Sequence, residues 1–209
     1  MGIVVQKPPI KETVGAQYVC FNTILEESND WSGQYEENVE KTNVVKSVKV
    51  TENTEVTDVY ASGDVYDSDT TASKTSIETQ VVAFPADTLA RMRGESVDEG
   101  GLHLSGGSGE RPFFAYGKVV KMKHGAVRFE WFPKCKLAEN TDEVATREEK
   151  FSEQTDTITI NAYPFNDNGD IRAYVDSSAS NFPEKLTEAK FFAKPILTKA
   201  DLATAVSST

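Results

Sequence analysis

The fold of this chain is decided by the stretch from Phe113 to Phe132, FFAYGKVVKMKHGAVRFEWF. Two runs rich in β-branched and aromatic residues, Phe113–Met122 and Ala126–Phe132, flank the tripeptide Lys123-His124-Gly125. In the second run apolar and charged residues alternate, which is the period of a strand that buries one face. Gly125 permits a positive φ, so the two runs are predicted to form an antiparallel hairpin.

The same strand signature recurs on both sides of this hairpin. It is clearest in Ser76–Ala83, where β-branched residues occupy alternate positions. A second hairpin is predicted from Asp156–Phe165 into Ile171–Val175, across the turn Asp167-Asn168-Gly169-Asp170. Further strands are predicted at Ala16–Ile24, Asn43–Thr51 and Glu55–Ala61. Roughly six to eight strands indicate a mainly-β (α+β) fold, either a β-sandwich or a partly closed antiparallel barrel.

One short helix is expected to flank this sheet. Pro85 suits the first helical turn and Gly94 stops the helix, so it is predicted at about residues 85–93. A weaker helical pattern runs from Pro183 to Phe192 and ends before Pro195. Neither a repeat nor a linker divides the chain. We therefore expect a single domain over residues 1–209, with an N-terminal arm at 1–14, a β core at 15–195 and a C-terminal tail at 196–209.

The charge of the chain argues against several classes of function. Its 209 residues include 33 acidic and 22 basic ones, and the net charge of −11 is spread along the chain. This excess disfavours tight DNA binding, which needs Lys and Arg against phosphate, and adhesion to an anionic membrane. No apolar run approaches the roughly 20 residues of a membrane span, and Met1–Pro9 lacks the apolar region of a signal peptide. A soluble protein, made and kept in the cytosol until another process moves it, is expected.

No constellation of residues indicates catalysis, a metal or a cofactor. His103 lies in a glycine-rich loop and His124 in a tight turn, and neither is near a nucleophile motif. Cys20 and Cys135 lack metal-ligand spacing and are expected to be reduced structural thiols. The acidic stretch Asp64–Asp69 departs from the spacing of a calcium loop. A hydrolase with an unrecognised pair of carboxylates stays open as an alternative, because 33 acids allow many accidental pairs.

Long polar stretches indicate an interaction surface. They are the Met1–Val14 arm, the acidic loop Glu26–Lys41 and the stretch Gly63–Lys74, and they exceed what a compact enzyme usually spends on loops. Such segments either bind a partner or become ordered in an assembly. The candidate subunit-interface residues within them are Trp31, Tyr35, Asp64, Tyr66 and Asp67.

Several motifs also occur in an informative order. Phe84–Leu89 (FPADTL) is a strand end that runs into the short helix, and Phe113–Gly117 and Trp131–Lys136 are strands that follow a glycine-rich loop. Glu148–Thr159 then leads from a loop back into the sheet. Together these pieces resemble the major tail (tail tube) protein of long, non-contractile-tailed bacteriophages of Gram-positive hosts. The resemblance spans roughly Tyr18 to Phe192, and the order and spacing of the pieces carry it.

This resemblance implies a structural virion protein, not an enzyme, without cofactor or metal. Copies of the chain would form hexameric rings stacked into a hollow tube around a tape-measure protein, in contact with tail terminator and tail-tip proteins. Viral DNA would pass through this siphovirus tail without specific binding, and an acidic lumen would repel it. The expected location is the virion tail, assembled in the host bacterial cytoplasm. No additional C-terminal immunoglobulin-like domain is expected.

A second hypothesis is a non-catalytic carbohydrate- or ligand-binding β-sandwich module of a virion. It would be favoured by a deep pocket lined by Trp31, Tyr35 or Tyr116, because aromatic rings stack on sugars and other ligands. The two hypotheses differ in what they require of the surface. A tube protein needs exposed strand edges and contact segments, whereas a binding module needs a concave site.

Overall fold

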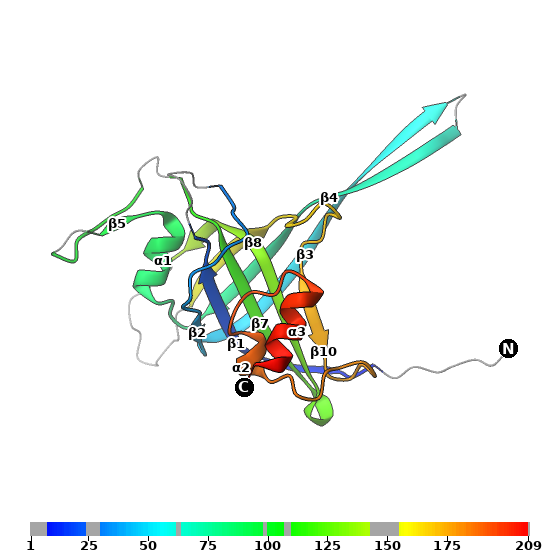
Figure 1. Ribbon diagram of the computed structural model, residues 1–209. Coiled ribbons are helices and arrows are strands. Elements are labelled where there is room, and N and C mark those ends of the chain that lie inside the picture. Colours follow the sequence, from blue (N-terminus) through cyan, green and yellow to red (C-terminus); the bar gives the residue numbers. More distant parts are fainter. Residues whose placement is uncertain are drawn as a thin grey trace, which may run out of the picture.

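The computed structural model describes residues 8–23, 30–61, 64–97, 100–106, 110–142 and 155–208, with the backbone alone at 53–61, 64–73 and 96–97 (Figure 1). The mainly-β prediction is confirmed: eight strands form one antiparallel sheet that is not closed into a barrel. Its order is β2-β1-β7-β8-β9-β4-β3, and β10 also pairs with β8. The strands are β1 (Lys11–Phe21), β2 (Glu40–Thr42), β3 (Val45–Ala61), β4 (Asp64–Val81), β7 (Phe114–Met122), β8 (Val127–Thr141), β9 (Asp156–Ala162) and β10 (Ala173–Asp176). A separate two-stranded sheet joins β5 (Ser96–Val97) to β6 (His103–Leu104).

The first predicted hairpin is confirmed, and the second is wrong. β7 and β8 pair across a turn in which His124 and Gly125 both have positive φ. In contrast, β9 and β10 both run antiparallel to β8, so they share one direction. The chain leaves β8 after the bond from the Tyr163 N–H to the Lys134 carbonyl, and Ala173 rejoins opposite Trp131. β8 is long enough for β9 and β10 to pair with successive parts of it. The Asn-Gly turn therefore lies in the loop that connects β9 to β10, and these two strands do not form a hairpin.

Both faces of the central strands are buried, which explains why seven consecutive residues at the start of β7 are buried. Tyr18 and Cys20 of β1 pack on one face, and their neighbours Val19 and Phe21 pack on the other. Strands that are covered on both faces carry continuous apolar runs, because neither face is exposed to solvent and needs polar side chains. We call the two clusters the outer core and the inner core. Their buried members are, for the outer core, Ala16, Tyr18, Cys20, Tyr35, Ala115, Val119, Phe129, Trp131, Leu186, Phe191, Phe192 and Ile196, and, for the inner core, Val19, Phe21, Ile77, Met92, Phe114, Tyr116, Phe132, Cys135, Leu137, Ile158, Ile160 and Ala162.

A bulge in β8 shifts its alternation between the two cores. Trp131 faces the outer core, whereas Phe132 and Cys135 both face the inner core although they are three positions apart. The register shows the extra residue, since three steps of β8 lie opposite two steps of β7. Pro133, which has no N–H to donate, lies inside this bulge.

The C-terminal segment covers the outer core, which corrects the prediction of a tail at 196–209. Helix α2 (Glu188–Phe191) falls within the predicted Pro183–Phe192 helix, and helix α3 (Lys199–Ser207) was not predicted. Both lie against β1, β7 and β8 in Figure 1. Phe192 stacks on Tyr18 at 3.9 Å between ring centroids, and the indole N–H of Trp131 donates to the Phe191 carbonyl at 3.1 Å.

Helix α1 (Ala86–Arg93) confirms the helix predicted at residues 85–93. Gly94 adopts the left-handed conformation and its N–H bonds back to the last turn, as the sequence indicated. Met92 is buried in the inner core. In the described part of the chain, none of the helices has the length and apolar character needed to span a membrane.

Candidate subunit interface

The longest hairpin of the sheet extends beyond the body of the protein. β3 and β4 pair from Val45 opposite Val81 to Ala61 opposite Asp64. β4 also pairs with β9, but only from Thr75 onward. The distal part, residues 53–61 and 64–74, therefore consists of two strands that pair with each other alone, and Figure 1 shows it projecting away from the body. We call this part the arm.

The arm corrects two boundaries drawn from the sequence. The strands predicted at Asn43–Thr51 and Glu55–Ala61 are one strand, β3, and the stretch Gly63–Lys74 is a strand from Asp64 onward. β-branched residues are frequent there, but the Asp and Ser residues between them have low strand propensity and indicated a loop. Nine residues of β3 lie in the arm, and at about 3.3 Å per residue they extend roughly 30 Å.

A two-stranded ribbon of this kind lacks the means to stabilise itself. An isolated two-stranded hairpin is only marginally stable in water. Independent stability normally needs a third strand and a hydrophobic face that packs against the rest of the protein. Its outer edges also present unpaired N–H and C=O groups, which pair readily with a strand of another chain. The arm is therefore the part of the described chain that is best suited to contact another subunit.

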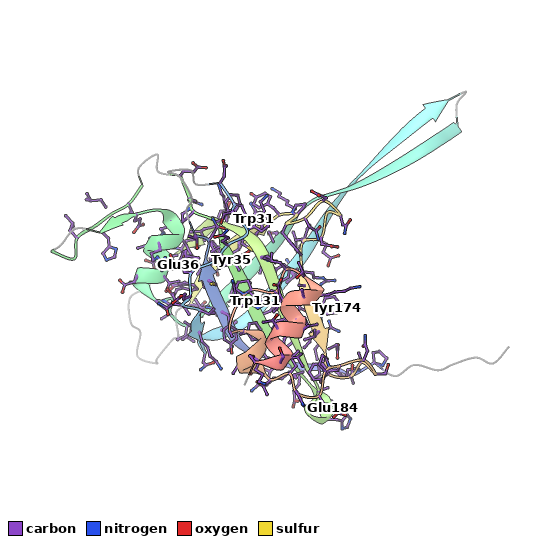
Figure 2. All side chains as sticks on the ribbon, viewed as in Figure 1. Trp31, Tyr35, Glu36, Trp131, Tyr174 and Glu184 are labelled. Carbon is purple, nitrogen blue, oxygen red and sulfur yellow. The ribbon has the colours of Figure 1, made fainter. Side chains whose placement is uncertain are left out.

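The interface residues predicted from the sequence fall into two separate places. Asp64 pairs with Ala61 at the tip of the arm, and Asp67 pairs with Val59 two pairs further down. Tyr66 lies between them on β4, and the side chains of all three lie outside the described residues. Trp31 lies on the body, as Figure 2 shows. The structure does not bring these two groups together within one chain.

Tyr35 has a structural role inside the body. It is 7% exposed and belongs to the outer core, and its hydroxyl donates to the Pro133 carbonyl at 2.8 Å. Burial raises the pKa of the Tyr35 phenol, so this hydroxyl stays protonated and keeps donating. The Trp31 indole N–H in turn donates to the Tyr35 oxygen at 3.3 Å. Tyr35 thus positions the half-buried Trp31 on the surface (Figure 2).

The sequence did not predict the surroundings of Trp31. Lys134 lies 5.1 Å from the Trp31 ring centroid and 5.6 Å from that of Phe113. Lys136 lies 4.2 Å from the Phe113 ring, and Tyr163 meets that ring edge-on at 6.4 Å. All five side chains are partly exposed. The alternation of Lys134 and Lys136 about the buried Cys135 was a usable signal, because it places both lysines on one face of β8.

The N-terminal stretch is more ordered than the sequence indicated. β1 begins at Lys11, inside the N-terminal segment Met1–Val14 that was predicted to extend from the body, and it pairs with β7 from its first residue. The remainder of that stretch, 1–7, lies outside the described residues, as does 26–29 of the predicted acidic loop Glu26–Lys41. Any contact role of the N-terminal stretch therefore stays a prediction for the residues before β1.

Cys20 and Cys135 lie on opposite faces of the sheet, in the outer and inner cores. Burial raises the pKa of the Cys20 thiol to about 12 and also raises that of Cys135. Both therefore stay protonated at neutral pH, which makes them poor nucleophiles and poor metal ligands. His103 is on β6 and the exposed His124 is in the β7–β8 turn, far from either thiol in the sheet. Within the described residues, no three His, Cys, Asp or Glu side chains cluster in a way that could hold a metal ion.

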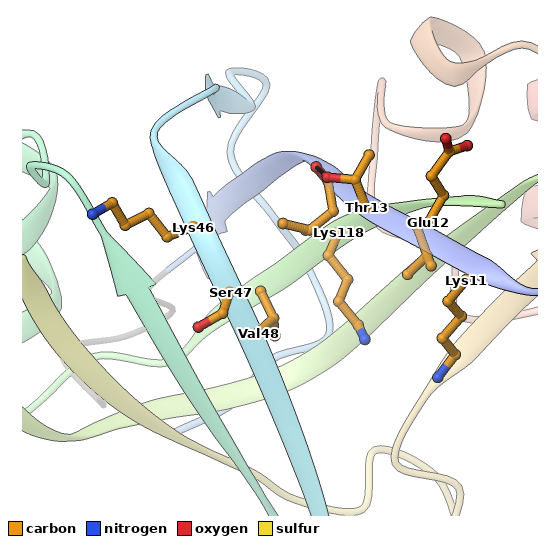
Figure 3. Close-up of a pocket in the computed structure, with 9 residues that line it drawn as sticks. Lys11, Glu12, Thr13, Lys46, Ser47, Val48 and Lys118 are labelled. Atoms are coloured by element: carbon orange, nitrogen blue, oxygen red, sulfur yellow. Dashed lines mark hydrogen bonds between the residues drawn. The ribbon is translucent and has the colours of Figure 1, made fainter.

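A groove between β1 and β3 has a volume of about 340 Å³. Figure 3 shows Lys118 extending into it from β7, between Thr13 and Val48. Lys118 forms an ion pair of 3.0 Å with the buried Glu130, so its charge is neutralised within the chain. Trp31, Tyr35 and Tyr116 do not line this groove, and Tyr116 is fully buried in the inner core. This groove is therefore not the aromatic-lined pocket that a ligand-binding module would require.

The comparison with protein families agrees with the architecture. The sequence profile described as "phage tail tube protein" matches residues 32–194, which is well over half of the chain. The match includes the arm, α1 and the strands of both cores from β2 onward. No curated protein matches the chain significantly.

Proposed function

Because the chain belongs to the phage tail tube protein family, a family of structural tail proteins, we propose that it is the major tail protein and self-assembles into the tube. Its copies form hexameric rings, and the rings stack into a hollow cylinder. The tape-measure protein occupies the lumen during assembly, and terminator and tail-tip proteins contact the two ends. The tail is long and non-contractile, and it is assembled in the cytoplasm of a Gram-positive host.

The observation that carries this proposal is the arm. A ribbon about 30 Å long, paired only with itself, gains stability when its edges and side chains contact a neighbouring copy. At the other end of the sheet β2 pairs with Gln17–Val19 of β1, and residues 34–36 bond to Phe21 and Thr23, so among the described residues it is the start of β1 that is unpaired on this side. A subunit with open edges at both ends of its sheet can repeat as a ring by strand pairing.

The net charge of −11 supports a passage for DNA. An acidic lumen repels phosphate and keeps the genome from adhering, whereas a basic lumen would bind it with salt-dependent affinity. Viral DNA therefore passes through the tube without specific contacts. A tube structure with a net positive lumen would contradict this part of the proposal.

Negative-stain electron microscopy of the purified protein, with its mass followed by light scattering over a concentration series, tests the proposal. Rings or hollow tubes with sixfold symmetry are the expected result. Another rotational symmetry would overturn the hexameric ring. A particle that stays monomeric up to the solubility limit would contradict self-assembly by this chain alone.

A further inference from the structure

The aromatic and lysine side chains around Trp31 form one surface patch. We call it the lysine–aromatic patch, and its members are Trp31, Phe113, Lys134, Lys136 and Tyr163. It lies on the part of the sheet that α2 and α3 do not cover, since those helices pack on Phe129 and Trp131 further along β8. Aromatic rings are enriched in surfaces that bind another protein, and the rings of this patch also attract the two lysine ammonium groups.

The patch carries positive charge that the carboxylates of the described residues compensate only in part. Lys134 forms no ion pair with the carboxylates of the described residues, and two aromatic rings flank its ammonium group. Lys136 pairs with Glu110 at 3.3 Å, but that carboxylate is 59% exposed and exchanges readily with water. In a chain with a net charge of −11, a lysine without an acidic partner among the described residues is available to a carboxylate of another molecule.

The other aromatic–cation surface of the body differs in this respect. Tyr174 is 53% exposed, and the guanidinium groups of Arg128 and Arg172 lie 5.4 and 5.3 Å from its ring. Arg128 is paired with Asp176, which is 14% exposed, and Arg172 forms a surface pair with Glu52 much like that of Lys136 with Glu110. Lys134 therefore differs from both arginines, because it has no ion pair with a carboxylate of the described residues.

The arm has the complementary charge. Between Asn53 and Ser73 its sequence contains no Lys or Arg, and its acids are Glu55, Asp58, Asp64, Asp67 and Asp69. With Lys74 at its base, the arm therefore has a net charge of −4 out of the −11 of the chain. The arm points away from its own body (Figure 1), so it does not reach the patch of the same copy.

We infer that the lysine–aromatic patch is the docking surface for the acidic arm of a second copy. This inference rests on the proposed function, because it assumes that copies of the chain assemble. Carboxylates near the tip of the arm, at Asp64, Asp67 and Asp69, pair with Lys134 and Lys136. Lys134 is held between two rings, so it is positioned before the arm arrives and loses little side-chain freedom on binding.

Charge reversal tests the contact. The double variant Lys134→Glu/Lys136→Glu replaces attraction with repulsion, and we expect the critical concentration for polymerisation to rise at least about tenfold. The matched control, Lys123→Glu/Lys185→Glu, makes the same change of net charge at two exposed lysines. These lie in the β7–β8 turn and beside Glu184, at the other end of the body from Trp31 (Figure 2). Circular dichroism and thermal unfolding show whether each variant folds.

A second set of changes identifies the occupant. Asp64→Lys/Asp67→Lys/Asp69→Lys, introduced into the Lys134→Glu/Lys136→Glu background, is expected to restore polymerisation to within a few-fold of the parent. Zero-length carbodiimide cross-linking of the parent polymer, made from mixed isotope-labelled and unlabelled protein, should join Lys134 or Lys136 to an acid of the arm in the other copy.

The outcomes separate the inference from the proposed function. A folded Lys134→Glu/Lys136→Glu variant that polymerises like the parent overturns the docking surface and leaves the tube intact. Loss of polymer without rescue by the arm variant overturns the arm as the occupant. If the arm acids cross-link only to lysines other than Lys134 and Lys136, this also overturns the arm as the occupant. A parent chain that forms no polymer overturns the proposed function itself.

Discussion

The body and the arm use the same antiparallel pairing and differ in everything that accompanies it. In the body, β1, β7 and β8 carry a buried core on each face, so each backbone hydrogen bond is protected by apolar side chains. In the arm, β3 and β4 have only each other as strand partners. Hydrogen bonding alone contributes little net stability in water, because water competes for the same groups. The body therefore holds most of the stability of the chain, and the arm is the part that would gain most from a contact with a second molecule.

The largest change in the free energy of unfolding is expected from Trp131, in the outer core of the body. It is fully buried, and its indole N–H is bonded to the Phe191 carbonyl. Trp131→Ala should lower the free energy of unfolding by about 3–5 kcal/mol, because it leaves a large cavity beneath the C-terminal segment. Urea denaturation followed by circular dichroism measures it. Trp31→Ala is the matched control and should cost less than about 1 kcal/mol, since that ring is partly exposed; equal losses would show that the outer core is not what stabilises the body.

A smaller loss is expected at Gly117 on β7. A Cβ at this position would lie 2.8 Å from Phe192 Cε1 and 2.9 Å from Trp131 Cε3, both in the outer core. Gly117→Ala should therefore destabilise the subunit by about 1–3 kcal/mol through overpacking. Gly100→Ala serves as the control, because a Cβ there has no atom of the described chain within 4 Å. The midpoints of thermal unfolding compare the two, and a neutral Gly117→Ala would show that the C-terminal segment yields easily.

Acid should destabilise the body through the carboxyl group of Asp176. Burial alone raises the pKa of the Asp176 carboxyl, but hydrogen bonds from Ser178 and Arg128 outweigh it and hold the pKa below its ordinary value. A lowered pKa in the folded state stabilises the protein above the unfolded-state pKa near 4, and this contribution is lost as the pH falls through the folded value.

Asp176→Asn should therefore reduce the loss of stability between about pH 5 and pH 2, by less than about 1 kcal/mol because the pair is near the surface. Urea midpoints at a series of pH values measure the slope. Glu188 is expected to act in the same direction. Burial alone would raise the pKa of its carboxyl, but hydrogen bonds from Lys41 and Tyr18 outweigh this and lower it. A variant with the same pH slope as the parent would show that Asp176 contributes nothing.

The smallest effect on stability is expected from removing the arm. Replacing residues 54–73 with an Asn-Gly turn joins Asn53 to Lys74, which are paired neighbours in the hairpin. The free energy of unfolding of the monomer should change by less than about 1 kcal/mol, because neither core includes a residue of the arm. Tube formation should be lost in electron micrographs. Normal tubes from this variant would show that the arm is not an assembly element, and a large fall in stability would show that it supports the body.

The sequence by itself determined the features whose causes are local. The β7–β8 hairpin follows from alternation on both sides of a glycine turn, and α1 follows from Pro85 and Gly94 at its ends. Helix α3 had such a signal as well, since Thr198 and Asp201 form a capping box that the sequence displays. The order and spacing of short motifs also indicated the family, because both can be read directly from the sequence without knowing how the strands pair.

Only the tertiary structure decided the features whose causes are distant in the chain. β10 pairs with β8 and not β9 because β8 is long enough for two partners, and Tyr35 is buried because the Pro133 carbonyl in the β8 bulge accepts its hydrogen bond. The contact of Lys134 with Trp31 joins residues about a hundred positions apart. Alternation along a strand tells which residues share a face, but which strand lies beside it, and what covers that face, depends on the packing of the whole chain.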